Sequence, residues 1–367
     1  MSLVPYLRAW RTTPLHDREV IDGLVDRAHE GPSRELAAAL AQWPGTYYWS
    51  DEPDGRHIVL TRPTHDAREA WGVHAALFIA VLISMTFSGG VLAAALPEDM
   101  TAWTRAALLH ALMRGLSFSL PLLAILLCHE LGHYLTARHY QLNVSPPFFI
   151  PGPPAPYGIG TFGAFIRLRT IVNDRRQLLD VGAAGPIAGF IVAVPLLWIG
   201  LAHSHPVAEP GVSGMVVYFT SETWQLGDSI VTLLVRHLSG YASGGGGGGG
   251  GAVALNPVAV AGWFGIFVTM LNLLPMAQLD GGHILYAAFP GWHRRVARFF
   301  WIVTLGLAWI SLTWLFWGVL VLLLSRGRLD HPPVLDAYRP LPPSRRWLVW
   351  VSLVLFVLTF IPAPFKR

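Results

Sequence analysis

Six apolar stretches follow residue 71, and they limit the fold of this chain more than any other feature. Each stretch is close to the length of about 20 residues that a helix needs to cross the hydrocarbon core of a bilayer. We therefore predict an all-α polytopic membrane protein with about six transmembrane segments. The predicted segments are residues 73–96, 116–137, 181–202, 257–275, 299–324 and 347–362.

The composition agrees with a membrane protein and argues against several other classes. Only 13% of the 367 residues are charged and 53% are hydrophobic, whereas soluble domains are about 25% charged. This balance argues against a disordered chain, and the single cysteine, Cys128, excludes an internal disulfide framework. The net charge is only +4, so we expect no nucleic-acid partner.

Residues 1–70 differ from the rest because they are polar and mixed in charge. We predict that they form a small α/β domain on the cytoplasmic side. Helical spacing predicts a helix over 17–28, and Ser33 is a suitable N-cap for a second short helix. Residues 47–49 and 57–61 are predicted to pair as a hairpin across an Asp-Glu-Pro-Asp-Gly turn.

Residues 71–363 form the predicted membrane-embedded domain. Between its second and third segments, residues 165–170 alternate in polarity like a β-strand. Residues 203–256 are predicted to be a polar outer loop that contains a helix over 225–239. This loop ends in eight consecutive glycines, 244–251, which we interpret as a flexible linker.

The distribution of arginine predicts the orientation, because short cytoplasmic loops carry an excess of Lys and Arg. The arginines cluster after the second and fourth segments, and few lie in the loops between. The N-terminus and the 138–180 loop should therefore be cytoplasmic, in a multi-pass protein of the cell (inner) membrane. The clustered arginines are Arg138, Arg167, Arg169, Arg175, Arg176, Arg294, Arg295 and Arg298.

Two topologies fit residues 299–324. A single crossing places the next arginine cluster, which begins at Arg326, on the outer side, against the positive-inside rule. As one helix the stretch would measure about 39 Å at ~1.5 Å per residue, which is too short for two full crossings. A break near residues 311–313 would give two half-length helices and return the arginines to the cytoplasm. The sequence leaves both topologies open.

The strongest chemical motif is His129-Glu130-Leu-Gly-His133, which ends the second apolar stretch. On a helix, His129 and His133 lie one turn apart on the same face, so both imidazoles can bind one metal ion. Glu130 lies next to them and can accept a proton from a metal-bound water. Ionisable residues are costly inside a membrane segment, which favours a functional site over a chance match.

A zinc site needs a further protein ligand besides two histidines. Among the acidic residues after Glu130, only Asp280 lies in an apolar segment, Asn272-Leu-Leu-Pro-Met-Ala-Gln-Leu-Asp-Gly-Gly-His283. Pro275 is predicted to break the fourth helix there, and the two glycines after Asp280 let its carboxylate point inward. His283 is an alternative ligand, and a simple helix cap is the alternative role for Asp280.

These two motifs resemble the site-2 protease family of intramembrane zinc metalloproteases. Two further patches match, Gly160-Thr-Phe-Gly-Ala-Phe165 and Ala184-Gly-Pro-Ile-Ala-Gly189, and the resemblance covers about residues 73–340. Many members carry a second proline where this chain has Met-Ala-Gln before the aspartate. The chain is in this respect more similar to the branch without a PDZ insert, which includes chloroplast members and bacterial relatives.

The resemblance implies one Zn²⁺ and a set of site residues. The metal ligands would be His129, His133 and Asp280. Glu130 would be the general base, and Asn272 would hold the substrate backbone or help to stabilise the oxyanion. The substrate would be a membrane protein, cut within or near a transmembrane helix in the lipid bilayer, as in regulated intramembrane proteolysis.

Substrate binding is predicted to involve residues 165–170, because a strand there can pair by its edge with an unwound substrate. The alternative is a connecting hairpin that only packs at the membrane interface.

Other functions compete with this interpretation. A different HExxH protease would need a glutamate ligand, and only Glu209 and Glu222 are available, both in the predicted outer loop. A metal-binding or transport protein without proteolytic activity is the alternative from another class. The glycines of 158–163 match a dinucleotide fingerprint, but no βαβ unit surrounds them.

Overall fold

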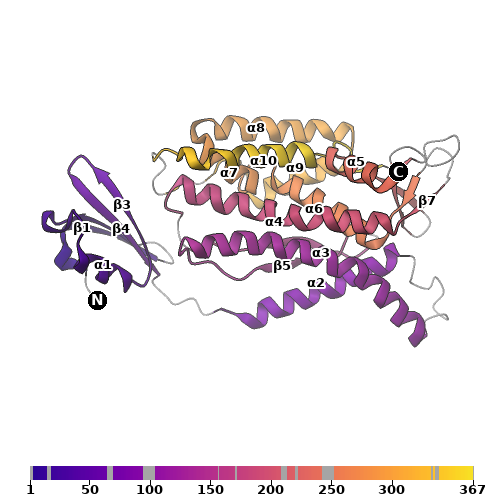
Figure 1. The fold of residues 1–367 in the computed structure, drawn as a ribbon, viewed down its shortest axis with the longest axis horizontal. Helices are drawn as coiled ribbons and strands as arrows, with labels where there is room; N and C mark the ends of the chain where they lie inside the picture. The colour runs from indigo at the N-terminus through magenta and orange to yellow at the C-terminus, as the bar shows by residue number, and fades with distance from the viewer. Residues whose placement is uncertain are drawn as a thin grey trace.

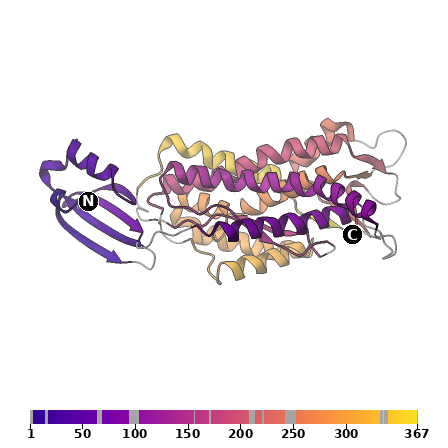
Figure 2. The same cartoon turned by 90° about the horizontal axis from the view of Figure 1, so that it is seen from below.

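The computed structural model describes residues 3–14, 18–63, 69–93, 104–155, 157–169, 172–207, 213–219, 222–241, 252–331, 334 and 339–366. The molecule is elongated, with the N-terminal sheet at one end, a bundle of helices in the middle, and strand β7 and the C-terminus at the other end (Figure 1). The perpendicular view shows the same order (Figure 2). The predicted glycine linker, 244–251, lies outside the described residues.

The N-terminal residues form an antiparallel sheet with the strand order β1-β2-β4-β3. Helix α1 packs on this sheet, because Leu36 and Leu40 of the helix share one buried cluster with Ile58 and Leu60 of β4. The elements are β1 (Leu7–Pro14), β2 (Arg18–Val25), α1 (Arg34–Ala41), β3 (Thr46–Glu52) and β4 (Gly55–Pro63).

Two of the three local predictions for this region are confirmed. The Ser33 hydroxyl accepts the Leu36 N–H at the start of α1, and β3 and β4 pair as the predicted hairpin. The predicted helix over 17–28 is wrong, because strand β2 occupies this stretch and pairs on both edges. Its β-branched residues and a glycine are poor helix formers, and the two neighbouring strands decide its conformation.

Three helices of the bundle are long and apolar enough to cross a membrane, as judged over the described residues. They are α2 (Trp71–Leu92), α3 (Arg105–His139) and α4 (Arg175–Ala202). The expectation of about six spans is therefore not confirmed, since the remaining predicted segments correspond to shorter helices. These are α6 (Pro257–Asn272), α8 (Pro290–Gly306), α9 (Thr313–Leu324) and α10 (Arg346–Thr359), and the short helix α7 (Asp280–Ala288) lies between the fourth and fifth predicted segments.

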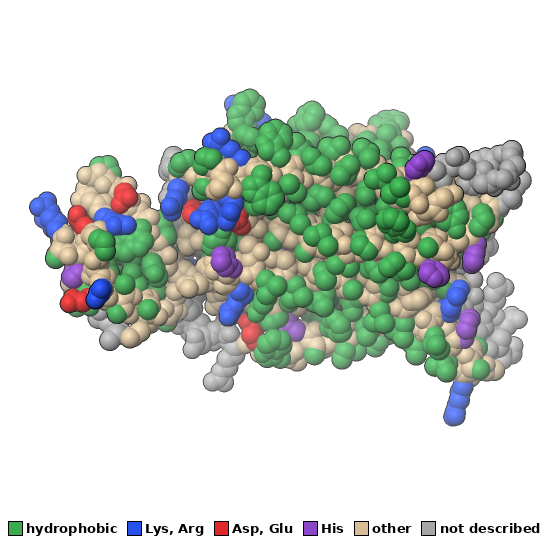
Figure 3. Space-filling model, viewed as in Figure 1, with side chains coloured by type: hydrophobic (Ala, Val, Ile, Leu, Met, Phe, Trp, Pro, Cys, Tyr) green, Lys and Arg blue, Asp and Glu red, His purple; other side chains and the backbone are tan. Residues whose placement is uncertain are grey.

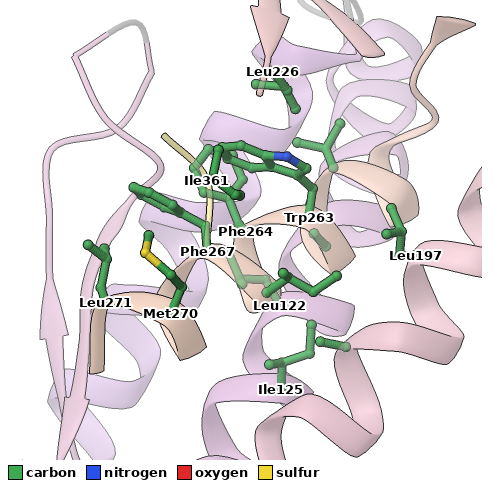
Figure 4. Packing of buried hydrophobic residues seen from close by; sticks show 14 of the residues in the cluster. Leu122, Ile125, Leu197, Leu226, Trp263, Phe264, Phe267, Met270, Leu271 and Ile361 are labelled. Atoms are coloured by element: carbon green, nitrogen blue, oxygen red, sulfur yellow. The ribbon is translucent and has the colours of Figure 1, made fainter. Parts of the chain in front are cut away.

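Helix α6 forms the centre of the bundle. It is apolar on all sides, and 13 of its 16 residues are buried, as expected for a helix surrounded by protein. Figure 4 shows Trp263 and Phe264 of α6 beside Leu122 of α3 and Leu197 of α4. The residues that leave α6 at its C-terminal end are therefore held against α3 and α4.

The stretch with two candidate topologies forms two antiparallel helices, α8 and α9, with the break at residues 307–312. The Trp301 indole N–H donates to Gly318 O at 3.0 Å. Arg294 near the start of α8 pairs with Asp330 after α9, with 3.3 Å between Nε and Oδ2. Both ends of this hairpin therefore lie at the same end of the bundle, which agrees with a break near residues 311–313.

The strand predicted over 165–170 is found earlier in the chain than expected. Strand β6 is Thr161–Phe165, and it pairs with β5 (Phe148–Pro151). Beyond β6, a single isolated bridge between Val144 and Leu168 is recorded. The later residues contact the segment before β5, where Ser145 N–H donates to Arg167 O and Arg169 N–H donates to Asn143 O. Pro146 and Pro147, which carry no N–H, separate these contacts from β5.

The predicted polar loop 203–256 contains a sheet that the sequence analysis missed. The strand order is β11-β9-β8-β10-β7, and helix α5 (Ile230–Arg236) is shorter than predicted. One of its strands comes from the C-terminus, far away in the sequence, so local pattern does not reveal it. The strands are β7 (His205–Val207), β8 (Gly214–Phe219), β9 (Glu222–Leu226), β10 (Ala252–Ala254) and β11 (Phe365–Lys366).

His57 of β4 lies between two carboxylates. Its Nδ1 is 2.9 Å from Asp22 Oδ1, and its Nε2 is 3.1 Å from Asp54 Oδ1. Burial of the ring opposes protonation, but the Asp22 and Asp54 carboxylates outweigh burial and raise the pKa of His57 above its usual value of 6.5.

We expect the N-terminal sheet to lose stability as the pH rises through the raised pKa of His57. The folded state binds this proton more tightly than the unfolded state, so the stabilisation is complete below pH 6.5 and disappears above the folded pKa. Hydrogen exchange of the β2 and β4 amides, corrected for its intrinsic pH dependence, should be faster at pH 8 than at pH 6. The His57→Asn variant should lack this change, and equal protection at both pH values in the wild type would contradict the prediction.

Candidate metal centre

Helix α3 carries the His129-Glu130-Leu-Gly-His133 motif in its C-terminal half. All three ionisable side chains are buried, with exposed fractions of 4% for His129, 5% for Glu130 and 7% for His133. The Nε2 atoms of the two histidines are 3.1 Å apart. The spacing of one helical turn therefore brings both imidazoles to one point, as predicted.

Asp280 reaches this point because the fourth predicted segment is broken. Helix α6 ends at Asn272 and α7 begins at Asp280, on either side of Pro275. The start of α7 packs against the backbone of this turn. The approach is so close that a Cβ atom added to Gly281 would lie 2.0 Å from Leu273 O. The Asp280 carboxylate lies 3.2 Å from His129 Nε2 through Oδ2 and 3.3 Å from His133 Nε2 through Oδ1.

The three side chains fit a zinc ion. Their ligand atoms lie within 4.8 Å of one another. The two Nε2 atoms are 3.1 Å apart, close to the ~3.3 Å that separates ligands held at 2.0–2.1 Å from a tetrahedral zinc. Asp280 Oδ2 is buried without a hydrogen-bond partner among the described residues, although His129 Nε2 is close. Two imidazoles and one carboxylate are the donor set of a catalytic site with an open fourth position.

Helix α4 orients His133, which the sequence analysis did not predict. The His133 Nδ1–H donates to Val181 O at 2.7 Å, so the lone pair of Nε2 faces Asp280. This contact requires α4 to approach α3 very closely. A Cβ atom added to Gly185 of α4 would lie only 2.1 Å from His133 Nε2. Small residues of this kind allow helices to pack closely in a membrane. The small residues of the Ala-Gly-Pro-Ile-Ala-Gly patch are the sequence feature that indicates this close helix contact.

Glu130 and Asn272 also lie at this site. The Glu130 carboxylate lies near the backbone N–H of Ile166, just after strand β6. Asn272 Nδ2 is 3.3 Å from His129 Nε2. The structure thus brings together all five residues selected from the sequence, and it adds the Ile166 N–H and the Val181 carbonyl.

Comparison with protein-family models matches residues 117–311 to peptidase family M50. This match covers more than half of the chain. The chain belongs to peptidase family M50. The resemblance to the site-2 proteases is thereby confirmed.

Several curated relatives of this M50 chain are named as chloroplast proteins, which agrees with the predicted branch of the family. It is 33% identical over 257 residues to "Probable zinc metalloprotease EGY1, chloroplastic" of Arabidopsis thaliana, a match that covers 68% of this chain and 43% of the relative. It is 32% identical over 266 residues to "Probable zinc metalloprotease EGY2, chloroplastic" of the same plant, covering 70% and 43%. The chain spans less than half the length of these relatives. No solved structure matches it significantly.

The alternative ligands lie elsewhere in the M50 chain. His283 Nδ1 is 2.6 Å from His331 Nε2, and His283 does not belong to the group of His129, His133 and Asp280 that could hold the metal. Glu222 begins strand β9 of the five-stranded sheet, and Glu209 lies outside the described residues. The glycines of 158–163 fall in a loop and in β6 rather than before a helix.

A carboxylate ties three helices together close to the site. The hydroxyl of Tyr140, the C-cap of α3, donates to Asp180 Oδ2. Arg345, at the start of α10, donates to the same oxygen through Nε at 2.9 Å. Asp180 immediately precedes Val181, whose carbonyl orients His133. The ends of α3, α4 and α10 are therefore joined one residue away from the metal centre.

We expect Gly185→Ala to impair metal binding by this M50 protein. The new methyl group would collide with the His133 ring, and losing the contacts that orient a metal-binding histidine costs about 10- to 100-fold in affinity. Metal content of the purified chain, measured during titration with a chelator, tests this. Gly306→Ala is the matched control, because a Cβ there meets nothing within 4 Å. Equal metal retention by the two variants would contradict the prediction.

Proposed function

We propose that this protein is a membrane-embedded zinc endopeptidase that cleaves membrane-protein substrates within or near their transmembrane helices. The observation that carries this proposal is the convergence of His129, His133 and Asp280 next to Glu130 inside an apolar bundle. Membership of the M50 family supports it, as do the zinc metalloproteases among the curated relatives.

His129, His133 and Asp280 would hold the ion, and Val181 O keeps the His133 ring in the required orientation. Zinc, when bound, lowers the pKa of a coordinated water to about 7 and polarises the scissile carbonyl. Glu130 accepts a proton from the attacking water and delivers it to the leaving amine. The Ile166 N–H holds the Glu130 carboxylate in place for both transfers.

Asn272 supplies the remaining polar group. Its amide nitrogen is near His129 Nε2, so an N–H of Asn272 can donate to the carbonyl oxygen of a substrate placed beside the metal ligands. Such a donor stabilises negative charge that develops on this oxygen during attack.

The hairpin of β5 and β6 is the proposed substrate-binding element. Strand β6 pairs with β5 on one edge, and no described strand pairs with its other edge. Phe162 and Phe165 of β6 are about half exposed, at 54% and 46%. Because Ile166 follows β6 and contacts Glu130, an extended substrate paired with β6 would run past the general base. Strand pairing also unwinds the substrate helix, as peptide-bond cleavage requires.

The proposed location is the inner cell membrane, with the N-terminal sheet and the metal centre toward the cytoplasm. Arginine side chains gather at the end of the bundle next to the N-terminal sheet, and hydrophobic side chains cover its middle (Figure 3). The C-terminal end of α3 lies at this same end, where Arg138 and Gly45 line one cavity. This arrangement agrees with the positive-inside rule.

We expect Glu130→Gln to keep zinc and to lose cleavage of a model transmembrane substrate by about 10²- to 10⁴-fold, the usual contribution of a general base. Glutamine has nearly the same shape but accepts no proton. The measurement combines zinc stoichiometry with cleavage rates in proteoliposomes. Asp280→Asn is the companion variant, for which zinc content itself should fall.

A wild-type protein that binds zinc but cleaves no transmembrane substrate would favour the second candidate, a metal-binding or transport protein. Full activity of Glu130→Gln would exclude the proposed proton transfers.

The Ile166→Pro variant should also lose cleavage while its zinc content stays normal. Proline removes the N–H that lies near Glu130, and it disturbs the end of the strand that would hold the substrate. Ile166→Val is the control, because it retains the N–H and the branched side chain. Wild-type cleavage by the proline variant would argue against a role for this backbone.

A further inference from the structure

A cavity lined by both polar and apolar side chains lies far from the metal centre, at the end of the bundle away from the N-terminal sheet. Its volume is about 450 Å³, and residues of α3, of the end of α4 and of the start of α6 line it. Arg114, fifteen residues before His129 on α3, is one of them, which separates it from the metal ligands by about 22 Å along the helix. Histidine and arginine side chains are visible at this end of the molecule (Figure 3).

The cavity lies at the level expected for lipid headgroups. Helix α3 has 35 residues and measures about 52 Å at 1.5 Å per residue, whereas the hydrocarbon core is ~30 Å thick. About 22 Å of α3 therefore extends beyond the core. Arg114 on α3, His203 at the end of α4 and Asn256 at the start of α6 meet at this cavity, so all three helices reach the membrane surface there.

Among the described residues, the lining carries one guanidinium and two imidazoles, from Arg114, His110 and His203, and neither Asp nor Glu. Arg114 is exposed, and its guanidinium has no ion-pair partner within the described part of the chain. The His203 ring is held in place because its Nδ1–H donates to Ile199 O at 2.8 Å. An anion in this cavity would therefore meet the positive charge of Arg114 and fixed polar groups.

Apolar side chains flank these polar groups. Met113 and Ile199 line the cavity, with exposed fractions of 64% and 53%, and Leu109 on the preceding turn of α3 is 58% exposed. If the phosphate of a lipid lies beside Arg114, the acyl chain of the same lipid can thus extend along these apolar residues. A soluble anion would use only the polar half of the site.

We propose that this cavity binds an anionic membrane phospholipid, with the headgroup phosphate at Arg114 and an acyl chain along Met113 and Ile199. The site goes beyond the proposed proteolysis, since it requires only that the bundle is embedded in a membrane. Bound lipid joins α3, α4 and α6, which carry the histidine ligands, the Val181 carbonyl and Asn272. It therefore stabilises the folded bundle by mass action.

Native mass spectrometry of the full chain in neutral detergent, titrated with phosphatidylglycerol, tests this site. Arg114→Gln should weaken retention of the lipid about fivefold, since one arginine near a membrane surface contributes that much to binding an anionic lipid. The matched control is Arg105→Gln, which removes the same charge from the same helix outside the cavity, and it should bind like the wild type. Phosphatidylglycerol should raise the Tm of the wild type and of Arg105→Gln more than that of Arg114→Gln.

Two results with the variants would overturn the proposal: Arg114→Gln retains the lipid as well as the wild type does, or Arg105→Gln loses as much lipid as Arg114→Gln. Two results with the wild type would also overturn it: zwitterionic phosphatidylcholine is retained as well as phosphatidylglycerol, or equimolar inorganic phosphate displaces the lipid. Equal zinc content and circular dichroism of the two variants establish that both are folded. Because the readout is bound lipid rather than cleavage, the result does not depend on whether the protein is a protease.

Discussion

Two imidazole nitrogens and a carboxylate face one another inside an apolar bundle, no more than 3.3 Å apart. Buried polar groups of this kind are costly unless hydrogen bonds or a shared cation compensate them. His133 has one such bond, to Val181 O, whereas Asp280 Oδ2 has none among the described residues. The need to bring these atoms together explains the two most irregular parts of the bundle, the broken segment around Pro275 and the close contact between α3 and α4.

The broken segment places a carboxylate where a continuous helix would place none. Irregular backbone at membrane depth is tolerated only where protein or a wet cavity surrounds it, and α6 provides that surrounding because nearly all of its residues are buried. The apolar core around Trp263 therefore has a chemical consequence. It holds Asn272 and the turn that leads to Asp280 against the histidines of α3.

Features with a local physical cause were predictable from the sequence. The i, i+4 spacing of His129 and His133 requires only a helix, and the cap at Ser33 needs only its own side chain and the next turn. Elements that depend on distant partners were not predictable. Strand β2 lies between two neighbouring strands, and β9 pairs with a strand from the C-terminus. Helical spacing or a polar composition carries no information about such partners.

The sequence by itself determined the chemistry of the site: which residues can bind a metal, and that Asp280 is the carboxylate in an otherwise apolar segment. Only the tertiary structure decided how that chemistry is arranged. It turned His283 toward His331, gave His133 its partner at Val181, and brought the Ile166 N–H to Glu130. The physical reason is that two of these contacts use backbone groups, which every residue type carries, so their position depends on helix packing and strand register rather than on side-chain identity.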